Sequence, residues 1–348
     1  MKTAALTLFA TITLLAGSAP VPAPAPPRGE SMRVVQQFKP GGTGGWDYLT
    51  FDGPGRRLFF GRGDRVMALD GATGKLLGEI PGTAGVHGVA LAPELKRGFT
   101  SNGRADSVTV FDLASLKIIS EVKVTGANPD AIVYDPFTRA VFTFNGRGNN
   151  ATVIDATTLK IVATLPLGGT PEFAVSDGGG KIFVNIEDTG EIVTIDAKAL
   201  KVLTRWSLAP CAEPSGLAMD VAHARLFSVC NNKKLMVTDA HSGRRVAELP
   251  IGEGPDAAAF DPARGLVFSS NREGSLTVIH EDDPDHYRVI ATVPTRTSAR
   301  TMALDPATHR IYLAAAEFGP APAPTASAPR PRPAMLPDSF VILVVADN

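Results

Sequence analysis

The chain has 348 residues, of which 44% are hydrophobic, and a formal net charge of −1. That length allows one large domain or two ordinary ones. The near-zero charge supplies neither an acidic tail nor the basic surface that nucleic acid requires, so we predict no nucleic-acid partner.

Residues 1–19 are predicted to be a Sec-type signal peptide. Met1-Lys2 precedes an apolar run from Ala4 to Leu15 that is too short to span a bilayer, and small residues follow it. Ser18 stands where a lipoprotein would carry its acylated Cys, which excludes a lipid anchor there. Residues 20–31 form a Pro/Ala-rich spacer. We therefore expect a periplasmic or secreted protein with no transmembrane segment in the mature chain.

A unit of roughly forty residues recurs seven times between residues 32 and 348. Similar segments recur, such as Phe-Thr-Ser-Asn at 99–102 and Phe-Thr-Phe-Asn at 142–145. The turns after the first strand of each unit are 40, 43, 42, 43, 41 and 44 residues apart, at Asp52, Ala92, Asp135, Asp177, Asp220, Asp261 and Asp305. Four short strands per unit predict an all-β fold, a seven-bladed β-propeller.

The first blade is expected to contain four strands, at Trp46–Phe51, Arg57–Gly61, Arg65–Leu69 and Lys75–Ile80. The last unit lacks a fourth strand, and a Pro/Ala-rich insertion at 319–337 interrupts it. Met32–Phe38 precedes the first blade without belonging to it. Pairing Arg33–Phe38 with Phe340–Val345 would complete the last blade and close the ring.

The chain has two cysteines, and an even count in an exported protein favours a disulfide. Cys211 lies in the connection that enters the fifth blade, and Cys230 ends the second strand of that blade. The repeat places both on one face, so we predict a Cys211–Cys230 bond that contributes about 3 kcal/mol.

Residues shared by all blades are assigned to the scaffold. One aromatic recurs in the second strands and is expected to pack between blades, namely Phe59, Phe99, Phe142, Phe183, Phe227, Phe268 and Tyr312. One carboxylate recurs in the turn after the third strand and is expected to cap that hairpin, namely Asp70, Asp112, Asp155, Asp196 and Asp239.

A different position differs from blade to blade. It lies five residues before each turn marker and holds Asp47, His87, Asp130, Glu172, Ser215, Asp256 and Arg300. Innermost strands line the channel of a propeller, so these side chains should converge on one mouth of it. Like charges brought together raise one another's pKa values unless a cation compensates, which makes this ring the candidate ligand-binding site.

The loops between the second and third strands open on the same face. Three of their arginines, Arg62, Arg104 and Arg147, belong to blades 1 to 3. We include them in the candidate ligand-binding site, where they would suit an anionic or polyhydroxyl ligand.

The strand ends of the type Phe-[Thr/Ser]-x-Asn and the Asp-x-x-[Thr/Ser]-Leu-Lys turns resemble the YVTN repeats of the YncE-like seven-bladed propellers. The segments Cys211–Leu217 and Ala299–Pro306 are similar to parts of exported bacterial members. The resemblance covers roughly residues 32 to 348. It implies a periplasmic propeller whose biochemical role is mostly unassigned, with metal-dependent lactonases among its wider relatives.

Two functions remain open. The first is a monomeric, non-enzymatic binding module of the cell envelope that holds a ligand, metal ion or protein partner over the ring. The second is a lactonase-like hydrolase in which Asp130, Glu172 and Asp256 bind Ca²⁺ or a similar hard cation. His87 or a remaining carboxylate of the ring would then be the general base. Binding is preferred, because a ring of carboxylates by itself makes no nucleophile.

Overall fold

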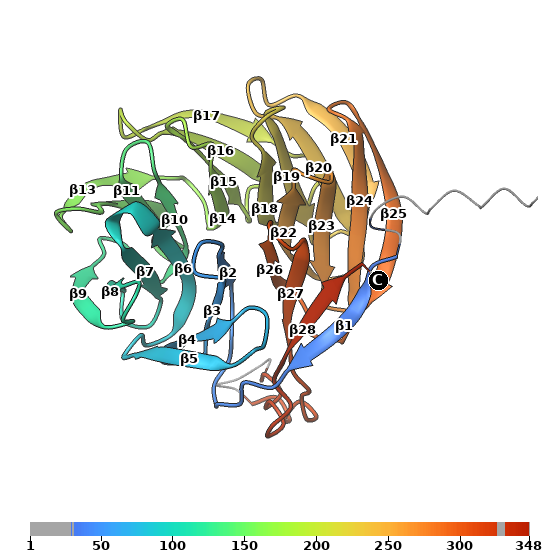
Figure 1. The fold of residues 1–348 in the computed structure, drawn as a ribbon. Coiled ribbons are helices and arrows are strands. Elements are labelled where there is room, and N and C mark those ends of the chain that lie inside the picture. The colour runs from blue at the N-terminus through green and yellow to red at the C-terminus, as the bar shows by residue number, and fades with distance from the viewer. Residues whose placement is uncertain (1–28, 30, 326–330, 348) are drawn as a thin grey trace, which may run out of the picture.

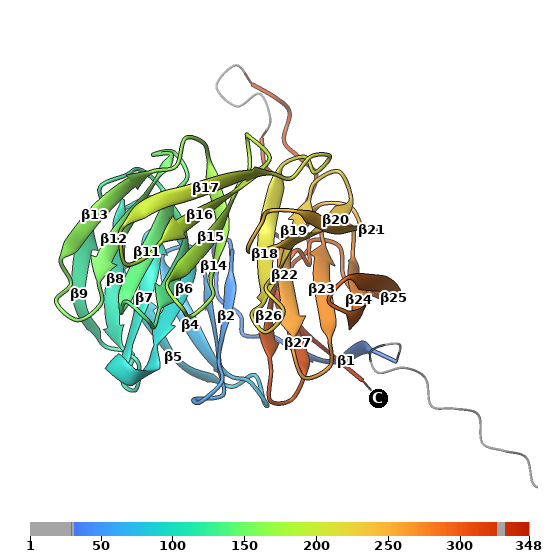
Figure 2. The same cartoon turned by 90° about the horizontal axis from the view of Figure 1, so that it is seen from above.

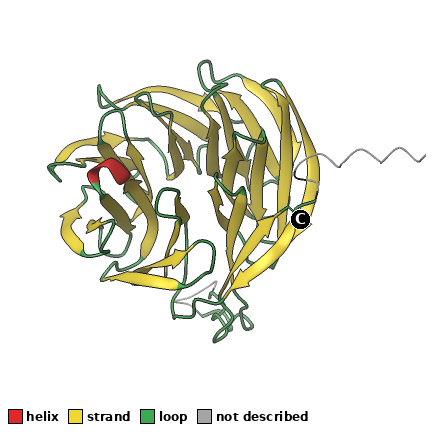
Figure 3. Ribbon diagram, in the orientation of Figure 1, coloured by secondary structure: helices red, strands yellow, loops and turns green. Residues whose placement is uncertain are grey.

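The computed structural model describes residues 29, 31–325 and 331–347. It is a seven-bladed β-propeller in which seven four-stranded antiparallel sheets surround a central axis (Figure 1). Among the described residues the single helical element is a short turn of 3-10 helix, Pro93–Leu95, drawn in red in Figure 3. The predicted all-β architecture is confirmed.

The strands of each blade follow one another in sequence. Blade 1 contains β2 (Leu49–Asp52), β3 (Arg57–Gly61), β4 (Arg65–Asp70) and β5 (Leu76–Pro81); blade 2 contains β6 (Val86–Ala92), β7 (Arg97–Asn102), β8 (Ser107–Asp112) and β9 (Ile118–Lys123). Blade 3 contains β10 (Pro129–Asp135), β11 (Ala140–Asn145), β12 (Asn150–Asp155) and β13 (Ile161–Pro166); blade 4 contains β14 (Pro171–Ser176), β15 (Lys181–Ile186), β16 (Glu191–Asp196) and β17 (Lys201–Ser207). Blade 5 contains β18 (Pro214–Asp220), β19 (Arg225–Cys230), β20 (Lys234–Asp239) and β21 (Arg245–Pro250); blade 6 contains β22 (Pro255–Asp261), β23 (Leu266–Asn271), β24 (Ser275–Asp283) and β25 (His286–Pro294).

Blade 7 is built from both ends of the chain. Its order is β1 (Arg33–Phe38), β28 (Val341–Ala346), β27 (Arg310–Ala315) and β26 (Thr301–Asp305). β1 runs antiparallel to β28, with Arg33 opposite Ala346 and Phe38 opposite Ile342. Figure 1 shows the blue N-terminal strand beside the red C-terminal one. The predicted closure is confirmed, and it leaves β28 with a hydrogen-bonded neighbour on each side.

Seven hydrophobic clusters hold neighbouring blades together. Each contains one of the recurring aromatics, all of which are at most 1% exposed. Phe59, for example, packs with Val66 of its own blade and with Val89 and Phe111 of blade 2. The hydrophobic effect therefore acts between the blades as well as within them, and it fixes how closely the seven innermost strands approach the axis.

The position at the end of each second strand, three residues after the aromatic, is fully buried in every blade. Its occupants are Arg62, Asn102, Asn145, Ile186, Cys230, Asn271 and Ala315. The asparagines bind neighbouring hydroxyls, as when Asn102 Nδ2 donates to Thr109 Oγ1 at 2.8 Å. Asn271 Nδ2 donates in the same way to Thr277 Oγ1 at 3.0 Å. The Asn of the repeat is thus a structural residue whose burial requires these partners.

The recurring aspartates cap their hairpins, as predicted. In blade 1, Asp70 Oδ1 accepts hydrogen bonds from the backbone N–H of Ala72 at 3.1 Å and of Thr73 at 2.8 Å. Asp112 and Asp239 make the same type of contact in their own turns. These carboxylates are satisfied locally, so they are part of the scaffold.

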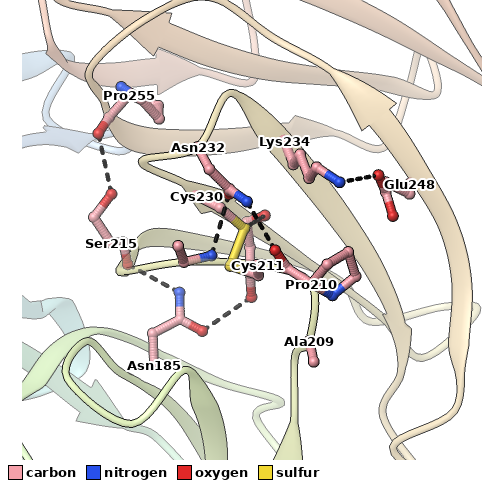
Figure 4. The surroundings of a disulfide bond; sticks show 12 residues. Asn185, Ala209, Pro210, Cys211, Ser215, Cys230, Asn232, Lys234, Glu248 and Pro255 are labelled. Atoms are coloured by element: carbon pink, nitrogen blue, oxygen red, sulfur yellow. Dashed lines mark hydrogen bonds and ion pairs between the residues drawn. A yellow bond between two sulfur atoms is a disulfide. The ribbon is translucent and has the colours of Figure 1, made fainter.

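A disulfide between Cys211 and Cys230 confirms the predicted pairing, with the two Cα atoms 5.4 Å apart. It ties the connection into blade 5 to the end of β19. Asn232 reinforces it by accepting a hydrogen bond from the N–H of Ala212 and donating one to the carbonyl of Pro210 (Figure 4). The bond fixes the segment that carries residues 213–215 toward the axis.

The insertion of blade 7 lies between β27 and β28. Its base is closed by a β-bridge between Phe318 and Met335, and Phe318 packs on Trp46 with 6.0 Å between ring centroids. The described part of the insertion projects from one face of the ring (Figure 2). The predicted signal peptide, residues 1–19, and nearly all of the spacer, residues 20–31, lie outside the described residues. In the part of the chain that is described, no helix has the length and hydrophobicity to cross a membrane.

Removing β1 is expected to abolish the cooperative fold, because it exposes the edge of β28 and one side of the last hydrophobic cluster. A chain that starts at Gly41 should aggregate or lose its cooperative thermal transition, as measured by size-exclusion chromatography and circular dichroism. A chain that starts at Ser31 keeps β1 and should melt like the mature protein. A monodisperse, cooperatively folded chain lacking residues 31–40 would contradict this role of β1.

Candidate functional site

All seven side chains of the predicted ring line one cavity at a mouth of the central channel. The cavity has a volume of about 740 Å³. Its lining also includes residues from the surrounding loops, namely Tyr48, Glu187, Glu213, Asn231, Glu253, Gly254, Pro255, Arg272, Glu273, Thr297 and Arg332. The convergence expected from the repeat alignment is present in the structure.

The backbone explains why this position faces the mouth in every blade. The residue lies at or just before the first pairs of the innermost strand, next to the loop that ends the second strand. That loop is bonded to the chain entering the blade, as in Gly103 N–H to Gly85 O at 2.9 Å and Gly146 N–H to Asn128 O at 2.9 Å. In blade 1 the strand begins only at Leu49, so Asp47 projects from the approach to β2.

Three ring residues from consecutive blades meet at one point. His87 Nδ1 lies 2.7 Å from Asp47 Oδ2 and 3.5 Å from Asp130 Oδ1. Burial lowers the pKa of His87, but the hydrogen bond to Asp47 and the charges of Asp130 and Asp47 outweigh it and raise the pKa overall. The imidazole is thus held between two carboxylates.

Arg300 provides the cation on the other side of the ring. Its guanidinium pairs with Asp256 and lies 3.8 Å from Asp47 Oδ1. Burial raises the pKa of Asp256 and the charge of Asp47 adds to this, although Arg300 opposes both. Arg300 is on blade 7 and Asp47 on blade 1, so this contact crosses the point where the ring closes.

Glu172 is the carboxyl group with the weakest compensation. Burial raises its pKa to about 9, and the charges of Asp130, Glu187, Asp256 and Asp47 add to the effect. Its neighbour is Tyr48, whose hydroxyl lies 3.5 Å from Glu172 Oε2 and whose own pKa is raised by burial and by Asp130. At neutral pH this carboxyl group is therefore protonated and can donate a hydrogen bond.

The lining of the cavity is strongly acidic. It includes eight carboxyl groups but three guanidinium groups, those of Arg272, Arg300 and Arg332. A cavity of one predominant sign concentrates ligands of the opposite sign. The geometry therefore favours a cation or a ligand with a positively charged group.

The alignment of the blades missed several lining residues, among them Tyr48, Glu213, Glu253 and Arg332. Glu213 and Glu253 lie two and three residues before the ring positions of their blades, so extending the aligned window toward the N-terminus would have found them. Tyr48 directly follows Asp47 and has no distinguishing signal. Arg332 belongs to the insertion, where no repeat indicates its position.

The three arginines of blades 1 to 3 do not line this cavity. Arg62 is fully buried: its Nη2 donates to Gly42 O at 2.6 Å, its Nη1 to Gly44 O, and its guanidinium stacks on Phe340. Arg104 and Arg147 are exposed outside the cavity. These side chains therefore do not gather at the channel mouth to hold an anionic or polyhydroxyl ligand. The cavity found there is lined mainly by carboxyl groups. Arg62 occupies the same repeat position as the Asn102 of blade 2. Aligning these two residues would have indicated from the sequence that Arg62 is a structural residue.

The expected metal-binding trio is also rearranged. Asp130, Glu172 and Asp256 all line the cavity, but Asp256 pairs with Arg300 and Glu172 faces Tyr48. Within this cavity, the potential ligand atoms that lie within 4.8 Å of one another are instead those of Asp47, His87 and Asp130. Ser215 is the ring residue without an ionisable side chain, and its hydroxyl donates a hydrogen bond to Pro255 O at 3.1 Å.

Comparison with known proteins supports the architecture. No family model and no curated protein sequence matches the chain. Among solved structures, the chain is similar to hydrazine synthase of Kuenenia stuttgartiensis, with a TM-score of 0.67 and 20% sequence identity over 76% of this chain and 91% of that one. At this identity the similarity shows the fold alone, and it places the chain among proteins that contain a seven-bladed β-propeller.

The raised pKa of Glu172 predicts a pH-dependent stability. The folded protein holds this proton up to about pH 9, whereas a carboxyl group in the unfolded chain releases it near its ordinary value of 4.5. Stability should therefore fall as pH rises between these values. Glu172→Gln should flatten this fall and increase the free energy of unfolding at pH 8 by at least about 1 kcal/mol, the equivalent of one pKa unit.

Urea denaturation of wild type and variant between pH 5 and pH 9 measures this effect. Glu79→Gln, on the exposed outer strand β5, is the control and should leave the profile unchanged. Parallel pH profiles for wild type and Glu172→Gln would contradict the assignment of a proton to Glu172.

The buried position of Arg62 predicts that it stabilises the fold. Arg62→Met would leave the carbonyls of Gly42 and Gly44 without their donors and should lower the free energy of unfolding by about 2–3 kcal/mol. Arg104→Met, on the exposed surface, should stay within about 0.5 kcal/mol of wild type. Denaturant unfolding compares the two. Equal stabilities of the two variants would contradict a stabilising role of the buried Arg62 side chain.

Proposed function

We propose that this chain is an exported β-propeller that binds a positively charged ligand in the channel-mouth cavity. The observation that carries the proposal is the composition of that cavity, with eight carboxyl groups and three guanidinium groups around about 740 Å³. The volume falls in the range of small-molecule sites, which supports a ligand rather than a structural ion alone.

Export is supported by two features. The disulfide between Cys211 and Cys230 is of the kind that persists in oxidising compartments, and the N-terminal sequence has the pattern of a signal peptide. The repeat motifs support membership of the YncE-like group. These features support a protein of the cell envelope or of the exterior of the cell, and our proposal takes it to act as a monomer.

Metal-assisted hydrolysis is the second candidate, and one observation favours it. Asp47 holds Nδ1 of His87 at 2.7 Å, an arrangement that orients an imidazole for proton transfer through its other nitrogen. The binding function is preferred because the lining of the cavity carries many charged groups. Its aliphatic hydroxyls, those of Ser215 and Thr297, both donate to backbone carbonyls.

The proposal predicts that the purified mature protein binds spermidine, used as a cationic probe, in isothermal titration calorimetry. Glu187→Gln/Glu213→Gln removes two charges from the lining and should weaken binding about 5- to 20-fold, with a further loss at high salt. Glu79→Gln/Glu121→Gln removes the same charge from outer strands and is the matched control.

Binding that is absent, or that is equally affected by both double variants, would overturn the assignment of the cationic ligand to this cavity. Hydrolysis of lactones or esters by wild type that is lost in His87→Ala would instead move the assignment to the hydrolase.

A further inference from the structure

Asp47, His87 and Asp130 occupy equivalent positions in three consecutive blades. Asp47 precedes β2, His87 is in β6 and Asp130 is in β10. One ligand atom of each lies within 4.8 Å of the other two, and His87 Nδ1 is the common neighbour. The spacing depends on how the blades pack around the axis, because His87 and Asp130 lie in innermost strands and Asp47 lies two residues before one.

One of these atoms has no hydrogen-bond partner. Asp130 Oδ1 is inaccessible to solvent and accepts no hydrogen bond, since His87 Nδ1 at 3.5 Å serves Asp47. A buried carboxylate oxygen without a donor costs more than a normal hydrogen bond contributes. Because that oxygen faces the other two ligand atoms, a cation between them would supply the missing interaction.

The guanidinium group of Arg300 is engaged elsewhere. Arg300 pairs with Asp256 and reaches Asp47 only at 3.8 Å. Asp47 and Asp130 therefore share one imidazole as their nearest positive group. A divalent ion that replaced the Nδ1 proton would neutralise both carboxylates at once.

We propose that Asp47, His87 and Asp130 bind a divalent transition-metal ion, Zn²⁺ or Mn²⁺, whose open coordination positions face the cavity. The inference rests on the proposed function, because it names the cation that the acidic cavity holds. An imidazole nitrogen with two carboxylates suits these ions, whereas Ca²⁺ requires six to eight oxygen ligands. The expected ion thus changes from a hard cation to one that binds nitrogen.

The surroundings of His87 support its use as a ligand through Nδ1. A Cβ atom on Gly103 would lie 2.5 Å from His87 Nε2 and 2.8 Å from Asn128 Oδ1. Glycine at 103 therefore leaves the space that the Nε2 side of the His87 ring and the Asn128 amide occupy. The ring is thus accommodated by the backbone of its own blade, with Nδ1 toward the carboxylates of Asp47 and Asp130.

A second group among the described residues also combines one imidazole with two carboxylates, and it serves as a control for the proposed site. His223 Nδ1 lies 2.5 Å from Asp220 Oδ2 and 3.5 Å from Glu281 Oε1. Here the carboxylates are already used: Glu281 Oε1 accepts from the Tyr287 hydroxyl at 3.2 Å and Asp220 Oδ1 from the N–H of Ala222 at 3.0 Å. We therefore place the metal at His87 and use His223 as the control.

The test is calorimetric titration of the purified, chelator-treated mature protein with Zn²⁺, Mn²⁺ and Ca²⁺, together with the visible absorption of bound Co²⁺. Wild type should bind one equivalent of a transition metal and bind Ca²⁺ more weakly. His87→Ala and the isosteric Asp130→Asn should each weaken binding by at least about 100-fold, and Gly103→Ala should alter the Co²⁺ spectrum. His223→Ala should match wild type. Thermal melts confirm that each variant is folded.

Wild type that binds none of these metals, or that loses metal binding through His223→Ala and not through His87→Ala, overturns the inference. Spermidine separates this failure from failure of the proposed function. If spermidine binds in the cavity and no metal does, the metal site is wrong and the cationic-ligand function stands. If neither binds, both are wrong.

Discussion

The pairing of β1 with β28 is the interaction on which the rest of the structure depends, because it decides whether seven blades form a ring or an open array. Phe38 of β1 packs on Tyr312, whose ring stacks on Phe51 of blade 1 at 5.3 Å. The contact of Arg300 with Asp47 crosses the same junction at the channel mouth. The geometry of the site therefore depends on closure of the ring. Opening the ring would separate the two sides of the charged cavity and would also expose a strand edge.

The fold could be predicted because the repeat combines three independent signals, namely spacing, a buried aromatic and a capping aspartate. The ring of site residues could be predicted by first assigning the recurring residues to the scaffold. A position that varies among otherwise similar blades has no common structural role. The sign of the charge that the ligand carries could not be predicted, because it depends on which loop side chains point into the cavity. Arg62 turns into the structure and satisfies carbonyls of a glycine-rich segment that has no strand partner, while Arg332 reaches the cavity from an insertion without any periodic pattern.

The carboxyl groups at the channel mouth destabilise the folded state, and they lie apart from most of the hydrophobic packing that stabilises it. Burial and mutual repulsion raise the pKa values of Asp130, Glu172 and Asp256, so each is less stable in its charged form than it would be in water. The hydrophobic clusters between blades contain none of these groups, and one of them reaches the cavity only through Tyr48. A local conflict of this kind, surrounded by consistent packing, is typical of functional positions.

The charges of the mouth are also divided between its two sides, and this constrains how a ligand would lie. All three lining guanidinium groups come from blades 6 and 7, whereas the described lining residues of blades 1 to 5 contribute five carboxyl groups and no guanidinium. The field is therefore directed across the channel and is not uniform. A positive group or metal ion is stabilised toward blades 1 to 4, and a neutral or negative part of the same ligand toward Arg272 and Arg300. A ligand with charge of both signs would bind in one orientation, and a metal at His87 would reinforce that orientation by offering its open positions to the negative end.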